Sequence, residues 1–382
     1  MKKRLVLLVS QNFAATGSEI ALYRLLQGST HSQIRFDAFL TASLKPELPI
    51  HGQLAYVYGV RAIDIIRHRM GAILRRIMGM KPRAMNGRSI RFESILRKNQ
   101  YDLVYFNTIV FPDLITICAQ LKIKYCVHVH ELEHMYGIYP QRSVAELSQL
   151  PAHLIFTSRA AEQAMKVLGP LPSSSIISPG ISIPDTKSPT VKRRPAALAR
   201  PFLWFGAGTD DVNKNIRLFI DTAGFLHKAG VNCHFVWLGI GMDNLRTAWL
   251  ENYANTLGLQ GRLRLLPRIT NPAEYTEHLS LADAVMITSF RESFSLVALE
   301  ALALGKPILT FKNGGHMEYM TRTNGVVVEN YDYQAFFRAA KSMVLRRNTF
   351  VPERIKKTAQ QFELSRQAKL WRETLHGILN EL

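Results

Sequence analysis

Short apolar runs alternate along the chain with segments whose apolar residues recur at helical spacing. Runs that are apolar on both faces are typical of parallel strands, because helices cover both sides of a parallel sheet. The alternation continues over the whole chain and predicts a doubly wound α/β fold. We expect buried strands over Leu5–Val9, Leu103–Phe106, Tyr125–Val129, Leu154–Phe156, Phe202–Phe205, His234–Leu238, Ala284–Ile287 and Pro307–Leu309.

A proline-rich stretch without apolar periodicity divides the chain almost in half. It predicts a linker over 183–200, between an N-terminal domain (1–182) and a C-terminal domain (201–355). The last segment, 356–382, reads as a helix that crosses back to the first domain. Two α/β domains of similar size imply a cleft between them, where ligands usually bind.

Composition excludes several other classes of protein. The 382 residues are 47% apolar and 20% charged, as in globular proteins, which rules out disorder, collagen-like repeats and coiled coil as the main architecture. The three cysteines form no close-spaced pattern, so we expect neither a disulfide framework nor a zinc site. The N-terminal apolar stretch is too short for a signal peptide and no run reaches the roughly 18 residues of a membrane span, so a cytoplasmic location is expected.

The net charge of +19 raises the question of an anionic partner, which could be nucleic acid, an anionic membrane surface or an acidic substrate. Residues 61–98 carry eleven Lys or Arg and only two acidic residues, with apolar residues at helical spacing between them. A basic amphipathic helix suits an anionic membrane surface, although a solvated helix packed on its domain would show the same pattern. No nucleic-acid-binding signature accompanies the charge, so nucleic acid is not the expected partner.

The segment 281–318 carries the most specific signal. It reads as a strand (Ala284–Ile287), a loop, and a helix to about Leu304 that Ser293 or Ser295 can cap. A helix that starts at the carboxyl end of a parallel strand binds anions, since its free N–H groups and its dipole favour phosphate. Glu300, inside this helix, can accept the two hydroxyls of a ribose, and Glu292, before it, can reach further hydroxyls.

This segment resembles the signature of glycosyltransferase family 4, the retaining nucleotide-sugar transferases with the two-domain GT-B fold. The family pattern is a Glu, a Gly-Phe-Gly-Leu-like turn, a second Glu followed by Ala, and Gly-Lys-Pro. Both turn glycines are serine here, and a following Gly-Gly-x-x-Glu is present as 314–318. The matching residues are Glu292, Phe294, Leu296, Glu300, Ala301, Gly305, Lys306 and Pro307.

The resemblance also implies residues that bind the donor diphosphate. The loop after the strand at Phe202–Phe205 contains Gly208, Thr209 and Lys214. Lys214 matches the lysine of the family's Arg-Lys clamp, while Thr209 stands at the arginine position and Arg268 is a candidate replacement. The other expected donor-binding residues are Gly17, Glu292, Ser293, Phe294, Ser295, Leu296, Val297 and Glu300.

In the N-terminal half, Gly17 matches a loop glycine near donor and acceptor, and His130 matches a histidine beside the donor sugar. His128, His130, Glu131, Glu133 and His134 lie close in sequence and raise the question of a metal, but strand alternation would scatter them. We expect no metal site and no cofactor. His130, Lys214 and Glu292 are the expected catalytic residues.

The function implied is transfer of a hexose, with retention and without a metal, from a nucleotide sugar to a glycan or lipid-linked acceptor in cell-surface polysaccharide synthesis. A UDP-sugar is the expected donor, with a GDP-sugar as the alternative. The enzyme would be peripheral on the inner face of a bacterial membrane. The alternatives are a GT-B sugar-nucleotide epimerase and a non-catalytic basic scaffold of the same fold.

Overall fold

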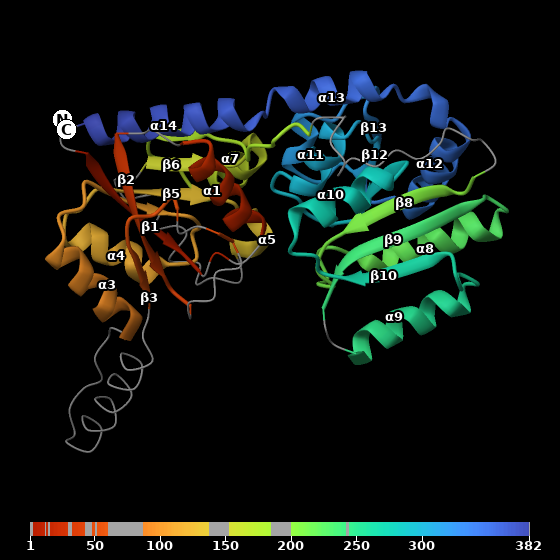
Figure 1. Cartoon of the computed structure of the whole chain (residues 1–382), viewed down its shortest axis with the longest axis horizontal. Coiled ribbons are helices and arrows are strands. Elements are labelled where there is room, and N and C mark those ends of the chain that lie inside the picture. Colours follow the sequence, from red (N-terminus) through yellow and green to blue (C-terminus); the bar gives the residue numbers. More distant parts are fainter. Residues whose placement is uncertain are drawn as a thin grey trace, which may run out of the picture. The chain divides into compact units, whose positions relative to one another are not determined.

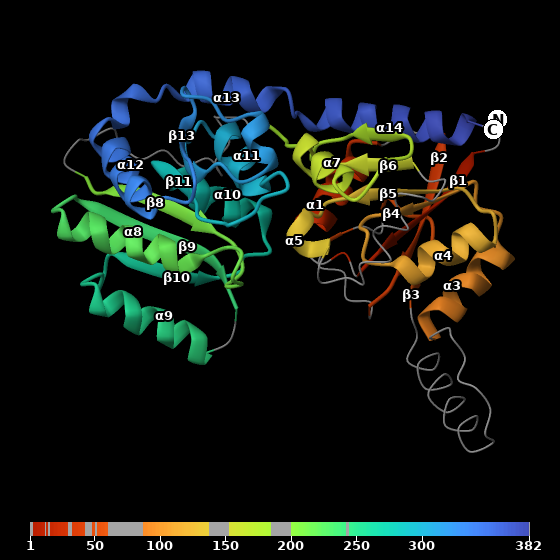
Figure 2. The same cartoon turned by 180° about the vertical axis from the view of Figure 1, so that it is seen from behind.

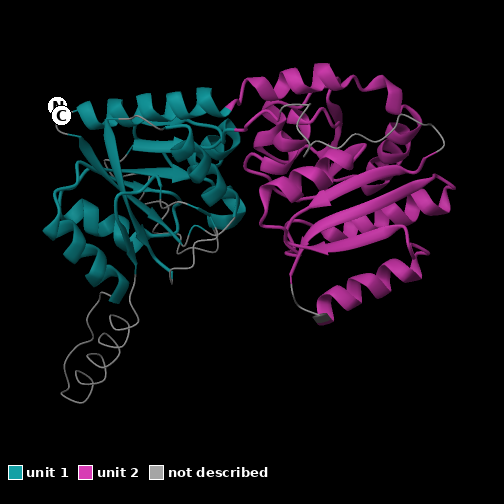
Figure 3. Cartoon of the chain, in the orientation of Figure 1, with its two compact units in different colours: residues 1–180, 364–382 teal, residues 181–363 magenta. Residues whose placement is uncertain are grey.

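The computed structural model describes residues 3–11, 13, 16–29, 33–42, 48–49, 52–59, 87–136, 153–184, 200–241 and 244–381. The chain divides into two compact units (Figure 3). Unit 1 holds residues 1–180 and 364–382, and unit 2 holds residues 181–363. Most of the expected linker (185–199) and most of the basic segment (61–86) lie outside the described residues.

Unit 1 is built on a fully parallel sheet, which in the described residues has seven strands in the order β3-β2-β1-β4-β5-β6-β7. The order reverses beside β1, which pairs with both β2 and β4. The strands are β1 (Arg4–Ser10), β2 (Ile34–Leu40), β3 (Val57–Gly59), β4 (Leu103–Phe106), β5 (Tyr125–Val129), β6 (His153–Phe156) and β7 (Ser174–Ile176).

Helices cover both faces of this sheet, as the apolar runs predict (Figures 1 and 2). In β1, Val6 and Leu8 pack on one face while Leu7 and Val9 pack on the other. The first face is covered by α1 (Gly17–Gln27) and α14 (Leu364–Asn380). Against the other face pack α3 (Gly87–Lys98), α4 (Pro112–Gln120), α5 (Glu133–Tyr136) and α7 (Arg159–Lys166).

Unit 2 repeats this plan with a parallel sheet of six described strands, in the order β10-β9-β8-β11-β12-β13. Here β8 stands where the order reverses, between β9 and β11. The strands are β8 (Phe202–Ala207), β9 (Cys233–Ile240), β10 (Leu263–Pro267), β11 (Ala284–Ile287), β12 (Ile308–Phe311) and β13 (Gly325–Val328). All eight predicted strands are present, and the predicted doubly wound α/β class is confirmed.

The two faces of the second sheet are also both covered. Trp204 and Trp237 pack under α8 (Ile216–Lys228), α9 (Asn244–Thr256) and α12 (Tyr333–Leu345). Phe205 and Val285 pack under α10 (Pro272–Leu281), α11 (Leu296–Ala303) and α13 (Pro352–Gln360). Two 3₁₀ turns, η1 (Gly315–Glu318) and η2 (Arg347–Thr349), complete the unit.

An aspartate fastens the first strand of each unit at the amino edge of its sheet. Asp102 accepts hydrogen bonds from the Leu5 amide (2.7 Å) and the Arg4 guanidinium (2.9 Å). Asp283 accepts from the Leu203 amide (2.8 Å) and the Arg200 guanidinium (2.6 and 2.5 Å). Both sheets are therefore locked at the edge opposite to the one where their strands end.

The C-terminal segment differs from the single helix that the sequence predicts. It forms two helices, α13 and α14, with a break after Gln360. At the break the Ile181 amide donates to the Phe362 carbonyl (2.9 Å), and Ile181 forms a β-bridge with Glu363. This pairing takes the backbone out of helical geometry, so α13 belongs to unit 2 and α14 to unit 1. In the part of the chain that the structure describes, no helix is long and apolar enough to cross a bilayer.

Candidate functional site

Ligands of doubly wound sheets bind at the carboxyl ends of the strands, where the strand order reverses. In unit 2 this is the edge where β8 and β11 end, and the loops after these strands are fastened to each other. The Asn213 side chain accepts from the Arg291 amide (2.9 Å) and donates to the Arg291 carbonyl (3.0 Å). The Thr288 hydroxyl donates to the Lys214 carbonyl (2.8 Å). The two loops therefore form one rigid rim.

Two oppositely charged side chains meet inside this rim. Lys214 Nζ lies 2.7 Å from Glu292 Oε1, and only 29% and 8% of their side chains are exposed. Burial alone would lower the pKa of Lys214 and raise that of Glu292, but each charge outweighs this effect on its partner. The pKa of Lys214 is therefore raised and that of Glu292 lowered, so both groups are charged at neutral pH.

Close backbone packing positions both residues of this pair. A Cβ on Gly208 would lie 2.9 Å from Lys214 Cγ, so the loop after β8 can lie along the lysine stem only with glycine there. A Cβ on Gly314 would lie 1.8 Å from the Glu292 carbonyl oxygen. That carbonyl accepts from the Gly315 amide (2.8 Å), which fixes the backbone of Glu292.

Helix α11 begins at Leu296, shortly after Glu292, as predicted, but its start is built differently. Ser295 occupies the N-cap position without a side-chain capping bond. Its backbone is left-handed (φ 67°), a conformation that favours glycine, whereas Ser293 is not among the described residues with positive φ. The expectation that a serine hydroxyl caps the helix is thus wrong for Ser295, because this backbone conformation holds the turn instead. The first-turn amides, including those of Leu296 and Val297, have no acceptor within the helix.

The remaining residues of the predicted turn divide between core and site. Phe294 is 2% exposed and packs on the Tyr319 and Phe362 rings, so its side chain belongs to the core. Tyr319 donates to the Phe294 carbonyl (2.6 Å) and lies 3.1 Å from the Ser295 carbonyl. Glu300 accepts a hydrogen bond from the Tyr275 hydroxyl of α10 (2.8 Å), a contact that sequence reasoning missed.

The arginine position of the clamp is occupied by exposed Thr209, whose hydroxyl donates to the Asp211 carboxylate. Arg268 is exposed in the segment after β10. Arg246 of α9 reaches the same loop as Thr209, where it forms an ion pair with Asp210 (2.8 Å) and donates to the Asp210 carbonyl. The sequence reasoning did not find Arg246, because its link to this loop spans 36 residues.

In unit 1 the predicted residues also lie at carboxyl ends of strands. Gly17 is the first residue of α1, and a Cβ there would meet open space. His130 follows β5 and its ring lies 4.1 Å from that of His128, centroid to centroid. Burial, and then the His128 ring, hold the pKa of His130 well below its usual range, so the imidazole is neutral. No group of three or more His, Cys, Asp or Glu among the described residues is placed to hold a metal ion.

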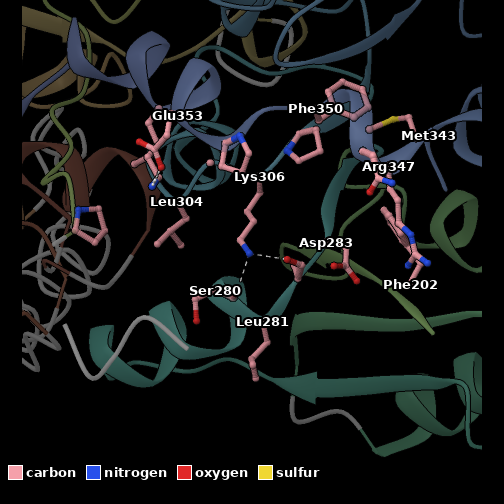
Figure 4. Close-up of a pocket in the computed structure, with 18 of the residues that line it drawn as sticks. Phe202, Ser280, Leu281, Asp283, Leu304, Lys306, Met343, Arg347, Phe350 and Glu353 are labelled. Atoms are coloured by element: carbon pink, nitrogen blue, oxygen red, sulfur yellow. Dashed lines mark hydrogen bonds and ion pairs between the residues drawn. The ribbon is translucent and has the colours of Figure 1, made fainter. Parts of the chain in front are cut away.

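A separate pocket of about 440 Å³ lies in unit 2 at the amino ends of β8, β11 and β12 (Figure 4). Lys306, the lysine of the Gly-Lys-Pro motif, points into it and donates to the carbonyls of Ser280 (2.6 Å) and Ala282 (2.7 Å). Lys306 therefore fastens the end of α10 at the edge opposite to the Lys214–Glu292 pair.

Known proteins are similar to this chain both in sequence and in fold. Residues 196–362, all in unit 2, match the family model of glycosyl transferases group 1. The structure is similar over nearly its whole length to Anabaena HepE in complex with UDP and glucose (TM-score 0.76, 17% identity, 97% and 99% of the two chains). It is equally similar to the sucrose-phosphate synthase of Thermosynechococcus elongatus (TM-score 0.76, 15% identity, 98% and 100%). The fold is thus GT-B, as predicted.

Curated relatives match a shorter region. The D-inositol 3-phosphate glycosyltransferase of Geodermatophilus obscurus is 36% identical over 110 residues, which are 28% of this chain and 24% of that protein. The corresponding protein of Streptosporangium roseum is 30% identical over 131 residues, 34% and 29% of the two chains. The chain spans about a quarter of the length of these relatives. Membership of glycosyltransferase family 4 stays a prediction.

Proposed function

We propose that this protein is a retaining glycosyltransferase of family 4 type that transfers a hexose from a nucleotide sugar, without a metal. The observation that carries the proposal is the buried Lys214–Glu292 pair beside the start of α11. It places a cation, a carboxylate and free helix amides around one point at the carboxyl edge of a parallel sheet. A nucleotide sugar offers a diphosphate, hydroxyls and a ribose to such a group of residues.

In this proposal the residues of unit 2 bind the donor. The backbone amides at Ser293–Val297, in the turn before α11 and at its start, stabilise the departing diphosphate together with the Lys214 ammonium, and Gly208 and Thr209 lie in the adjoining loop. We propose Arg246 as the second cation, because it reaches the loop that carries Thr209, and Arg268 is the alternative. Glu292 binds sugar hydroxyls and Glu300 binds the ribose. The UDP in the HepE structure and the match to glycosyl transferases group 1 support a UDP-sugar as donor.

Unit 1 would contribute the acceptor side. His130 would contact the donor sugar and Gly17 would allow close approach of substrate at the start of α1. The net charge of +19 suits an anionic acceptor, such as a lipid-linked glycan intermediate at the inner face of a bacterial membrane. Binding to vesicles that depends on anionic lipid and weakens with salt would support this placement, and binding indifferent to both would remove it.

A transfer assay tests the proposal. The chain is incubated with UDP-glucose, UDP-galactose, UDP-N-acetylglucosamine or GDP-mannose and a bacterial membrane lipid extract, and product anomers are identified by NMR. Lys214→Met and Glu292→Gln should each reduce turnover by at least ~10², the loss expected when a preorganised charge contact is removed. Lys312→Met is the control, since Lys312 forms an exposed ion pair with Glu329. Near-normal turnover in both site variants would contradict the assignment, and acceptor-free equilibration of the nucleotide sugar would indicate an epimerase.

A further inference from the structure

Asn107 lies at the centre of the carboxyl edge of the unit 1 sheet. It follows β4 directly, its amide donates to the Val9 carbonyl of β1 (2.9 Å), and only 1% of the residue is exposed. The backbone of Asn107 is therefore fixed by the sheet, at the point where the strand order reverses. A buried amide side chain at such a point requires partners for both its nitrogen and its oxygen.

Both partners are present, and they come from two other elements. Asn107 Nδ2 donates to the Ser18 carbonyl in the first turn of α1 (3.2 Å). Since a carbonyl only accepts, this bond turns the amide nitrogen toward α1 and the amide oxygen toward β5. Asn107 Oδ1 lies 3.2 Å from His130 Nε2. Because Oδ1 can only accept, the proton of the neutral His130 ring must sit on Nε2.

The neighbouring histidine, His128, packs against the His130 ring. His128 is fully buried, its Nδ1 lies 2.5 Å from the Tyr105 hydroxyl, and burial lowers the pKa of His128 to about 3. The His128 ring is therefore neutral and held in place, and it packs against the His130 ring. With Nε2–H bonded to Asn107, the lone pair on Nδ1 is the hydrogen-bonding capacity that His130 offers to a ligand.

We propose that Asn107 is the positioning residue of His130: it fixes the Nε2–H tautomer and ties the ring to the start of α1, so that His130 accepts a hydrogen bond from a sugar hydroxyl. The inference rests on the proposed function, because it deepens the role of His130 in donor binding. It also limits the sugar to one with a hydroxyl at this point, since a carboxylate there would meet a lone pair.

Histidine ring ¹⁵N spectra test the tautomer without any substrate. With ¹⁵N-histidine labelling and assignment by the His130→Gln spectrum, wild-type His130 should show a protonated Nε2 and an unprotonated Nδ1. Asn107→Leu should mix or reverse the two signals, while Asn99→Ala, which removes a bond to the Ile95 carbonyl in the same unit, should leave them unchanged. Unchanged His130 signals in Asn107→Leu would overturn the proposal.

A second variant keeps the proposal testable if Asn107→Leu does not fold. Asn107→Asp retains an acceptor for Nε2–H and adds a negative charge, so His130 should keep its proton on Nε2 and titrate at higher pH than in the wild type. Titration at the wild-type position would overturn the proposal. Wherever a donor is turned over, Asn107→Leu should lower kcat about 10- to 100-fold, the loss expected from a misplaced contact, with UDP affinity unchanged. If the wild type transfers no sugar, the proposed function fails while the ring signals still decide the role of Asn107.

Discussion

Lys214 Nζ and Glu292 Oε1 lie 2.7 Å apart although 78 residues separate them in the chain. The loops that carry them follow β8 and β11, the two strands that meet where the sheet order reverses. The pair therefore joins the two halves of the sheet at the point where a ligand would bind. Each charge is stabilised by the other before any substrate arrives.

Removing one member of this pair should destabilise unit 2 more than removing both. Lys214→Met removes the partner of a carboxylate that is almost fully buried, so we expect a loss of about 3 kcal/mol in the free energy of unfolding. Glu292→Gln should cost less, since Lys214 is more exposed. The double variant should be more stable than Lys214→Met alone. Urea denaturation of the four proteins gives this cycle, and simple additivity of the two losses would show that the groups do not interact.

Arg246 should matter for the diphosphate and not for the nucleoside. A charge-assisted bond to phosphate is worth about 1.5–3 kcal/mol, so Arg246→Ala should weaken UDP binding roughly tenfold or more and leave uridine binding unchanged. Arg268→Ala, measured in parallel, should have the smaller effect. The opposite ranking would assign the second cation to Arg268.

Ser295 should be strained where Ser293 is not. Its left-handed backbone costs about 1 kcal/mol for a residue with a side chain, so Ser295→Gly should raise the free energy of unfolding by up to that amount. Ser293→Gly is the matched control and should not raise the free energy of unfolding. Equal effects of the two substitutions in thermal unfolding would contradict this account of the turn.

Buried neutral histidines should make the protein sensitive to acid. Burial lowers the pKa of His316 to about 4, from 6.5 in the unfolded chain. Between these two pH values the unfolded state binds a proton on His316 and the folded state does not. The stability is complete above pH 6.5 and falls between pH 6.5 and about 4, by about 1.4 kcal/mol per pH unit for each such group. His316→Gln should reduce the pH dependence of the free energy of unfolding by the equivalent of one proton. Denaturation curves at pH 7, 6 and 5 measure this dependence. An unchanged slope would show that His316 does not contribute.

The sequence predicts those strands that are apolar on both faces, because burial on both sides leaves a continuous apolar run. It misses β2, in which Arg35 and Asp37 interrupt the pattern, β10, in which Arg264 does so, and the short strands β3, β7 and β13. The break between α13 and α14 is also invisible in sequence, since it depends on pairing between Ile181 and Glu363.

The site shows the same division between local and distant information. The turn at Glu292 and the start of α11 follow from residues adjacent in the chain. The contacts of Tyr275 with Glu300 and of Arg246 with Asp210 join residues that are distant in sequence, so they could not be predicted. Asn107 was visible as a polar residue directly after a buried strand, but only its bonds to Ser18 and His130 reveal what it does.

Calorimetric titration of UDP, GDP, ADP and CMP tests the central claim, that unit 2 binds a nucleotide diphosphate. Glu300→Ala is compared with wild type, and Glu329→Ala, which removes an exposed carboxylate, is the control. We expect selective binding of UDP that Glu300→Ala weakens by at least about tenfold, the equivalent of one good hydrogen bond to a charged group. Binding of none of the four nucleotides by the wild-type protein would contradict the claim and would favour a basic, non-catalytic scaffold.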